Sequence, residues 1–92
     1  MKRADIDLAP HDLWRDRLAA EFDAMSRELE AMGGRLCTDI AVVRGHMEAL
    51  QAIDHLAQRA QYSARLLRMP DIEQGIAECP LAEMAERLRT AA

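Results

Sequence analysis

The chain has 92 residues, of which 50% are apolar and 3% aromatic, with 12 basic and 16 acidic side chains and a formal net charge of −4. The length allows a single domain, 1–92. The scarcity of β-branched and aromatic residues excludes a β-sandwich or β-barrel. The acidic balance argues against nucleic acid as the main partner, because phosphate binding needs clustered positive charge. We expect an all-α protein whose thin core favours self-association.

Residues 1–9 are polar and mixed and are predicted to form a flexible tail. Pro10 suits the first turn of a helix. A heptad-like apolar stripe then follows on one face of a helix predicted over 10–33, formed by Leu18, Phe22, Met25, Leu29 and Met32. Gly33-Gly34 is the strongest break in the sequence and predicts a turn. The alternative is an unbroken helix through both glycines, at a cost of about 2 kcal/mol in propensity.

A long second helix is predicted over 36–68. Thr38-Asp39 offers an N-terminus, Gly45 is tolerated inside the helix, and Pro70 ends it because proline disfavours helical geometry in the preceding residue. At about 1.5 Å per residue, this helix would be about 50 Å long and would overhang a first helix of about 33 Å. The two helices predict an antiparallel hairpin.

The C-terminal helical segment is predicted over 71–90, with a short turn of helix before Pro80 and an amphipathic stretch after it. Leu81, Met84 and Leu88 lie on one face of that stretch. This face either folds back over the hairpin or serves as a docking helix for a partner. Two helices per chain and a thin core predict a homodimeric four-helix bundle.

The long helix has two faces when residues are placed at about 100° per step. The predicted packing face contains Val42, His46, Ala49, Leu50, Ile53, Ala57, Ala60, Ala64 and Leu67. A flanking set, which we call the polar strip, contains Gln51, Asp54, Gln58, Gln61 and Arg65. Three interpretations are open: the strip is simply solvated, its glutamines set the register of a dimer by hydrogen bonding, or it is a working surface.

One motif favours the working surface. Leu50-Gln51-Ala52-Ile53-Asp54-His55-Leu56-Ala57-Gln58 places an acid and an amide one helical turn apart, so that they project side by side. The segment resembles the active-site helix of CheZ-type chemotaxis phosphatases, in which Leu-Gln-x-x-Asp-x-x-x-Gln recurs. Its Asp-x-x-x-Gln core is also similar to the phosphatase motif of nitrate-sensor-type kinases. The resemblance covers about ten residues.

The resemblance implies a bacterial signalling protein that binds or dephosphorylates a response regulator. Asp54 and Gln58 would be catalytic: Asp54 pairs with the regulator's conserved lysine, and Gln58 orients the attacking water. Gln51, His55, Gln61 and Arg65 are then candidate partner-binding residues. The Mg²⁺ would belong to the regulator, and no cofactor is expected on this chain. Those kinases carry their phosphorylated histidine directly before the Asp, where this chain has Ile53, which disfavours autokinase chemistry.

The remaining candidates indicate structural roles. Cys37 and Cys79 lack zinc-ligand spacing and are predicted to be free thiols, as is usual in cytoplasmic proteins. His46 falls on the predicted packing face and is interpreted as a partly buried structural residue.

The first residues lack the apolar run of a signal peptide, and no segment is apolar enough for a membrane span, so we expect a cytoplasmic protein. The alternative function is a non-enzymatic helical dimerisation or protein-interaction module.

Overall fold

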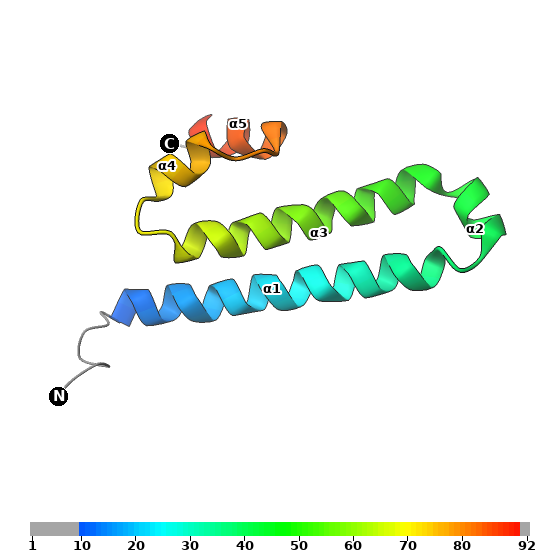
Figure 1. Cartoon of the computed structure of the whole chain (residues 1–92), viewed down its shortest axis with the longest axis horizontal. Helices are drawn as coiled ribbons and strands as arrows, with labels where there is room; N and C mark the ends of the chain where they lie inside the picture. The colour runs from blue at the N-terminus through cyan, green and yellow to red at the C-terminus, as the bar shows by residue number, and fades with distance from the viewer. Residues whose placement is uncertain (1–9, 91–92) are drawn as a thin grey trace.

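A computed structural model of the chain describes residues 10–90. The elements over this range are α1 (Pro10–Leu36), α2 (Ile40–Gly45), α3 (Met47–Arg68), α4 (Ile72–Ala77) and α5 (Ala82–Thr90), with no strand among the described residues. As Figure 1 shows, α1 and α3 form a long antiparallel hairpin, α2 lies at its tip, and α4 and α5 fold back along α3. The predicted all-α hairpin with C-terminal helices is confirmed, whereas the predicted tail 1–9 lies outside the described residues.

The turn predicted at Gly33-Gly34 is wrong, because α1 continues through both glycines and ends at Leu36. Neither glycine has a positive φ, so neither forms the left-handed cap that ends many helices. Gly33 instead faces α3, where an added Cβ would lie 3.5 Å from Ile53 Cγ2. This packing of Gly33 against α3 offsets the low helix propensity at that position, whereas a Cβ at Gly34 would meet nothing within 4 Å. The chain reverses after Leu36, and the Asp39 carboxylate caps α2 by accepting a 2.9 Å hydrogen bond from the Ala41 N–H.

The single long helix predicted over 36–68 is also wrong, because the chain breaks at His46 (φ −137°, ψ 36°) between α2 and α3. Gly45, a poor helix former, is the last residue of α2 and is not accommodated inside a longer helix, contrary to prediction. With 22 residues, α3 is shorter than α1 with 27, so the predicted overhang of the second helix does not occur. His46 and Ala49 are exposed, contrary to prediction: His46 lies at the break itself, where the helical periodicity is interrupted, and Ala49 lies in the first turn of α3.

The contact between α1 and α3 is made mainly by small side chains. Ala19 and Ser26 are buried on α1, and the predicted packing face of α3 is buried at Leu50, Ala57, Ala60 and Ala64. Small side chains allow the two helix axes to approach closely. The large apolar side chains of α1 lie to one side of this contact, so the core is as thin as the composition predicts.

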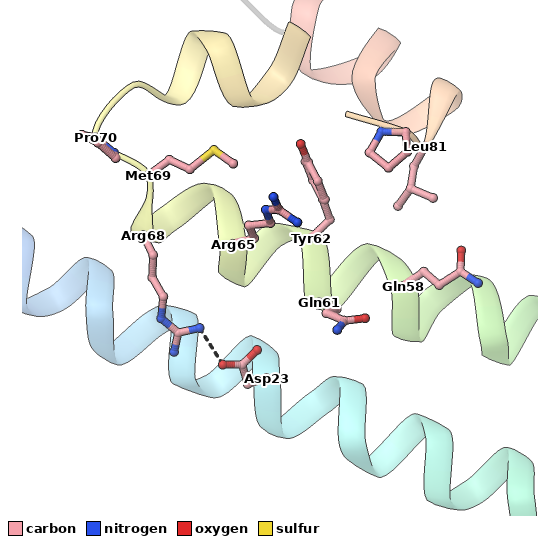
Figure 2. A pocket seen from close by; sticks show the side chains of 10 residues that line it. Asp23, Gln58, Gln61, Tyr62, Arg65, Arg68, Met69, Pro70 and Leu81 are labelled. Atoms are coloured by element: carbon pink, nitrogen blue, oxygen red, sulfur yellow. Dashed lines mark hydrogen bonds and ion pairs between the residues drawn. The ribbon is translucent and has the colours of Figure 1, made fainter. Parts of the chain in front are cut away.

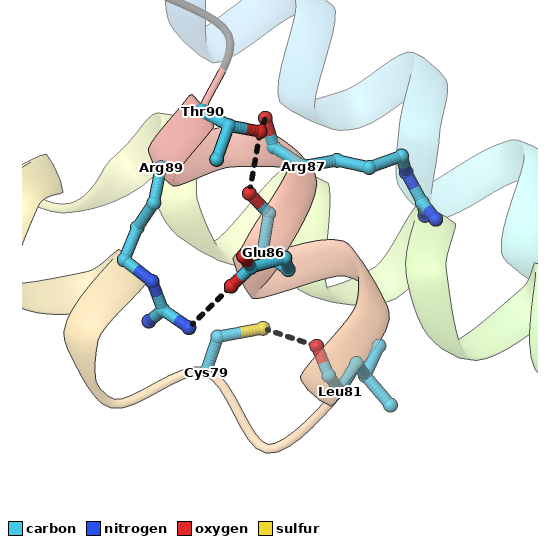
Figure 3. Close-up of polar contacts among 6 residues, drawn as sticks. All are labelled: Cys79, Leu81, Glu86, Arg87, Arg89 and Thr90. Atoms are coloured by element: carbon cyan, nitrogen blue, oxygen red, sulfur yellow. Dashed lines mark hydrogen bonds and ion pairs between the residues drawn. The ribbon is translucent and has the colours of Figure 1, made fainter.

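The C-terminal segment, called the C-terminal arm below and spanning residues 71–90, is tied back onto the hairpin. Asp71 caps α4 by accepting a 3.1 Å hydrogen bond from the Gln74 N–H. Met84 and Ala85 of α5 are 7% and 3% exposed. Within the arm, the Cys79 thiol lies 3.6 Å from the Leu81 carbonyl oxygen, as Figure 3 shows. The arm therefore folds back over the chain, one of the two alternatives that its amphipathic pattern allowed.

Candidate functional site

The polar strip lies on the solvent-facing surface of α3. All five of its side chains, Gln51, Asp54, Gln58, Gln61 and Arg65, are exposed, and so is His55. α3 is held by α1 on one side and by the C-terminal arm on the other, as Figure 1 shows. The strip therefore stands on a supported helix and is not covered by another element of the described chain.

Asp54 and Gln58 form a fixed pair within the strip. The side-chain amide of Gln58 donates a 3.0 Å hydrogen bond from Nε2 to Asp54 Oδ2. The two residues are one helical turn apart, the spacing at which side chains on a helix meet. Nε2 is engaged in this way, and Gln58 Oε1 accepts no side-chain hydrogen bond within residues 10–90, so it can accept one from another molecule.

A groove opens beside Gln58, between α3 and the C-terminal arm, and we call it the polar groove (Figure 2). It has a volume of about 640 Å³. Gln58, Gln61, Tyr62 and Arg65 form its α3 wall, and Met69 and Leu81 belong to its apolar side. Two of the predicted partner-binding residues, Gln61 and Arg65, thus line the same groove as Gln58, whereas Gln51 and His55 do not.

The two arginines at this groove have different electrostatic surroundings. Arg68 donates a 2.7 Å hydrogen bond to Asp23 Oδ2 and lies 3.8 Å from Asp16 Oδ1. The hydrogen bond to Asp23 raises the pKa of the Arg68 guanidinium, so this charge is already compensated. Within residues 10–90, Arg65 has no carboxylate within ion-pair distance, and its guanidinium lies 6.0 Å from the centre of the Tyr62 ring. Arg65 is therefore the positive charge that the groove offers to a partner.

Sequence reasoning missed the ion pair of Arg68 with Asp23, which closes the open end of the hairpin. The two residues are 45 positions apart. Their only sequence signal is the antiparallel register of the hairpin. That register depends on where the chain turns, and the predicted turn at Gly33-Gly34 lies inside α1.

A second hollow, called the glycine notch below, lies on the other side of Asp54. It has a volume of about 410 Å³ and is lined by Gly33 and Gly34 of α1 and by Leu50, Ile53 and Asp54 of α3. A Cβ at Gly34 would meet nothing within 4 Å, so the missing side chain leaves open space there. Asp54 and Gln58 consequently sit between two hollows, the glycine notch and the polar groove.

Residues 10–90 contain no group of three or more His, Cys, Asp or Glu side chains placed to hold a metal ion. Cys37 and Cys79 are free thiols, as predicted. None of the helices in this range is long and apolar enough to cross a membrane.

Comparison of the chain with protein-family models, curated proteins and solved structures gives no match.

Proposed function

We propose that this protein is a small, homodimeric cytosolic signalling protein that binds a phosphorylated response regulator and accelerates hydrolysis of its aspartyl phosphate. The supporting observation is the pair of Asp54 and Gln58, which is exposed and hydrogen-bonded on α3 between two hollows. Burial of this pair against another helix would have left no space for a globular partner. The resemblance of residues 50–58 to CheZ-type phosphatases gives the exposed pair its chemical interpretation.

The proposed reaction requires the catalyst mainly to position the attacking water molecule. An acyl phosphate has a good leaving group, and an Mg²⁺ ion held by the regulator would neutralise charge on the phosphoryl oxygens. Gln58 Oε1 accepts a hydrogen bond from a water molecule. This hydrogen bond directs the oxygen atom of the water at the phosphorus atom. The P–O bond to the regulator's aspartate breaks as the water attacks, which yields inorganic phosphate and a free carboxylate. Positioning of this kind is an established source of rate acceleration, and a neutral amide on a rigid helix can supply it.

Asp54 has two roles in this proposal. Its carboxylate pairs with a lysine of the regulator, and its Oδ2 atom holds the amide of Gln58 in place. The glycine notch beside Asp54 gives a long lysine side chain room to approach. Arg65 and Gln61 contact the regulator along the polar groove, whereas Gln51 and His55 contact it on the exposed surface next to the pair.

A second candidate function is a non-enzymatic helical interaction module. The observation that favours it is the exposure of large apolar side chains on α1, since Leu18, Met25 and Met32 are 51%, 47% and 43% exposed. Contiguous exposed apolar surface is typical of protein–protein contacts. In this case the polar strip would be an ordinary solvated helix surface, and the protein would not affect the lifetime of any acyl phosphate.

Phosphate release separates the two candidates. Purified response regulators from the same organism are phosphorylated, and the loss of phosphate is followed with and without the protein. The proposed function predicts that the protein accelerates release from at least one regulator. Unchanged release from every regulator in the set would contradict it and leave the interaction module.

A further inference from the structure

The large apolar side chains of α1 form a surface that α3 does not cover. Leu18, Met25 and Met32, called the α1 ridge below, follow one another at heptad spacing and are all exposed. Ala19 and Ser26, which are buried against α3, each follow a ridge residue by one position. At about 100° per residue, the ridge therefore points roughly at a right angle to the α3 contact. A helix in a four-helix bundle contacts its two neighbours in directions related in this way.

An apolar groove lies on the opposite face of α3 from Asp54, between α1 and α5. Its volume is about 470 Å³, and its apolar lining comes from Phe22, Met25 and Leu29 of α1, Leu56 and Ala60 of α3, and Met84 and Leu88 of α5. Leu56 and Leu88 are 43% and 38% exposed, so part of the lining faces solvent in the single chain, whereas Ala60 and Met84 are buried. Because α5 supplies one wall, this groove exists only when the C-terminal arm is folded back.

The charges beside the ridge and the groove are complementary. Arg59 and Arg87 are the only charged residues that line the apolar groove. Glu21 and Glu28 are exposed beside the ridge, on the side of α1 that faces away from α3. None of these four side chains has an ion-pair partner among residues 10–90. One chain thus carries an apolar ridge bordered by two carboxylates and an apolar groove bordered by two guanidinium groups.

We propose that a second copy of this chain inserts its α1 ridge into the apolar groove, so that Glu21 and Glu28 of each copy face Arg59 and Arg87 of the other. Met25 and Ala60 line the same groove and are therefore level along the hairpin. A twofold axis parallel to the helices places each Met25 at the level of the other copy's Ala60. In this arrangement each α1 is antiparallel to the α3 helices of both copies and parallel to the other copy's α1, and the interface is the same patch on both copies.

This interface is independent of the proposed phosphatase chemistry. Leu56 and Ser63 of the groove lie about 160–180° around α3 from Asp54, so the two polar strips face away from the interface. The dimer would therefore present two separate polar strips to solvent. Loss of the dimer leaves the test of Asp54 and Gln58 unaffected, and failure of the phosphatase activity leaves the interface unaffected.

Sedimentation equilibrium measures the assembly directly. The wild-type chain is expected at twice the mass of a single chain. Met25→Glu places a charge in the centre of the ridge at an exposed position and is expected to weaken self-association at least about tenfold. Gln58→Ala, on the opposite face, is the control and should dimerise like the wild type. Far-UV circular dichroism checks that each variant keeps its helices. A wild-type chain that sediments as a monomer would overturn the proposal.

Exchanging the charges of the ridge and the groove tests whether their acidic and basic side chains pair across the interface. One variant carries Glu21→Arg and Glu28→Arg, and the other carries Arg59→Glu and Arg87→Glu. Each variant alone places like charges opposite one another and is expected to self-associate at least about tenfold more weakly than the wild type. An equimolar mixture of the two variants restores opposite charges at both halves of the interface and is expected to form a heterodimer. Wild-type dimerisation of either variant alone, or a mixture that stays monomeric, would overturn the proposed pairing.

Discussion

The hydroxyl of Tyr62 on α3 donates a 2.7 Å hydrogen bond to the carbonyl oxygen of Gly75 on α4, and this contact ties the C-terminal arm to the hairpin. Gly75 is buried at the same place, where a side chain would overlap Leu66 and Met69. These contacts fix the position of the arm beside α3. Both grooves depend on them, because the arm contributes Leu81 to the polar groove and Leu88 to the apolar groove.

Removal of the Tyr62 hydroxyl should loosen this connection. Tyr62→Phe keeps the ring and deletes one partly buried hydrogen bond, which typically contributes about 1 kcal/mol to stability. We expect the free energy of unfolding to fall by about that amount in urea titrations. An unfolding free energy equal to that of the wild type would show that water replaces the hydroxyl at the Gly75 carbonyl without loss.

Alanine substitution at two helical glycines should change the stability of the chain in opposite directions. Gly75→Ala also gains helix propensity, but it places a Cβ against the Leu66 and Met69 side chains, and such overpacking costs roughly 1–3 kcal/mol. Gly34→Ala meets no atom within 4 Å and gains helix propensity, so it should stabilise the chain by up to about 1 kcal/mol. Thermal and urea unfolding of the two variants test this contrast. Equal effects at the two positions would contradict the close contact between the arm and α3.

Much of the fold follows from local sequence signals. Pro10, Asp39, Asp71 and Pro70 mark helix boundaries through backbone chemistry that acts within a few residues, and the structure places boundaries at or next to each. The two errors involve glycines. Whether Gly33-Gly34 and Gly45 interrupt a helix depends on what packs against them, because their propensity cost is small compared with tertiary contacts. Gly33 has Ile53 as a neighbour, whereas Gly45 has nothing within 4 Å; Gly34 also has nothing within 4 Å and stays helical because it directly follows Gly33 in a helix that packs along α3.

Part of the candidate site could likewise be predicted from the sequence, and part could not. The shared face and exposure of Asp54 and Gln58 could be predicted, because helical periodicity fixes which side chains point together. The polar groove and the glycine notch could not, since both are formed between elements. The groove depends on the position of the arm, which rests on contacts such as that of Tyr62 with Gly75. The notch exists because α1 continues past Gly33 alongside α3.

Filling the glycine notch should interfere with the proposed partner. Gly34→Leu introduces a bulky side chain beside Asp54, and we expect it to weaken the response to a phosphorylated regulator by about tenfold through loss of binding. The effect should appear as a higher regulator concentration at half-maximal rate. Gly34→Ala, which barely fills the notch, is the matched control. A normal response from Gly34→Leu would exclude the notch from the contact surface.

The most direct test of the proposed function compares two glutamines in matched settings. Gln58 donates to Asp54 at 3.0 Å on α3, and Gln74 donates to Glu78 at 3.0 Å on α4. Both pairs are exposed and span one helical turn. Acyl-phosphate hydrolysis is measured under single-turnover conditions, with the protein in excess over a phosphorylated regulator. We predict that Gln58→Ala slows hydrolysis by about 10²-fold, because the attacking water loses its position, while Gln74→Ala retains the wild-type rate. Equal rates for the two variants would contradict the catalytic role of Gln58.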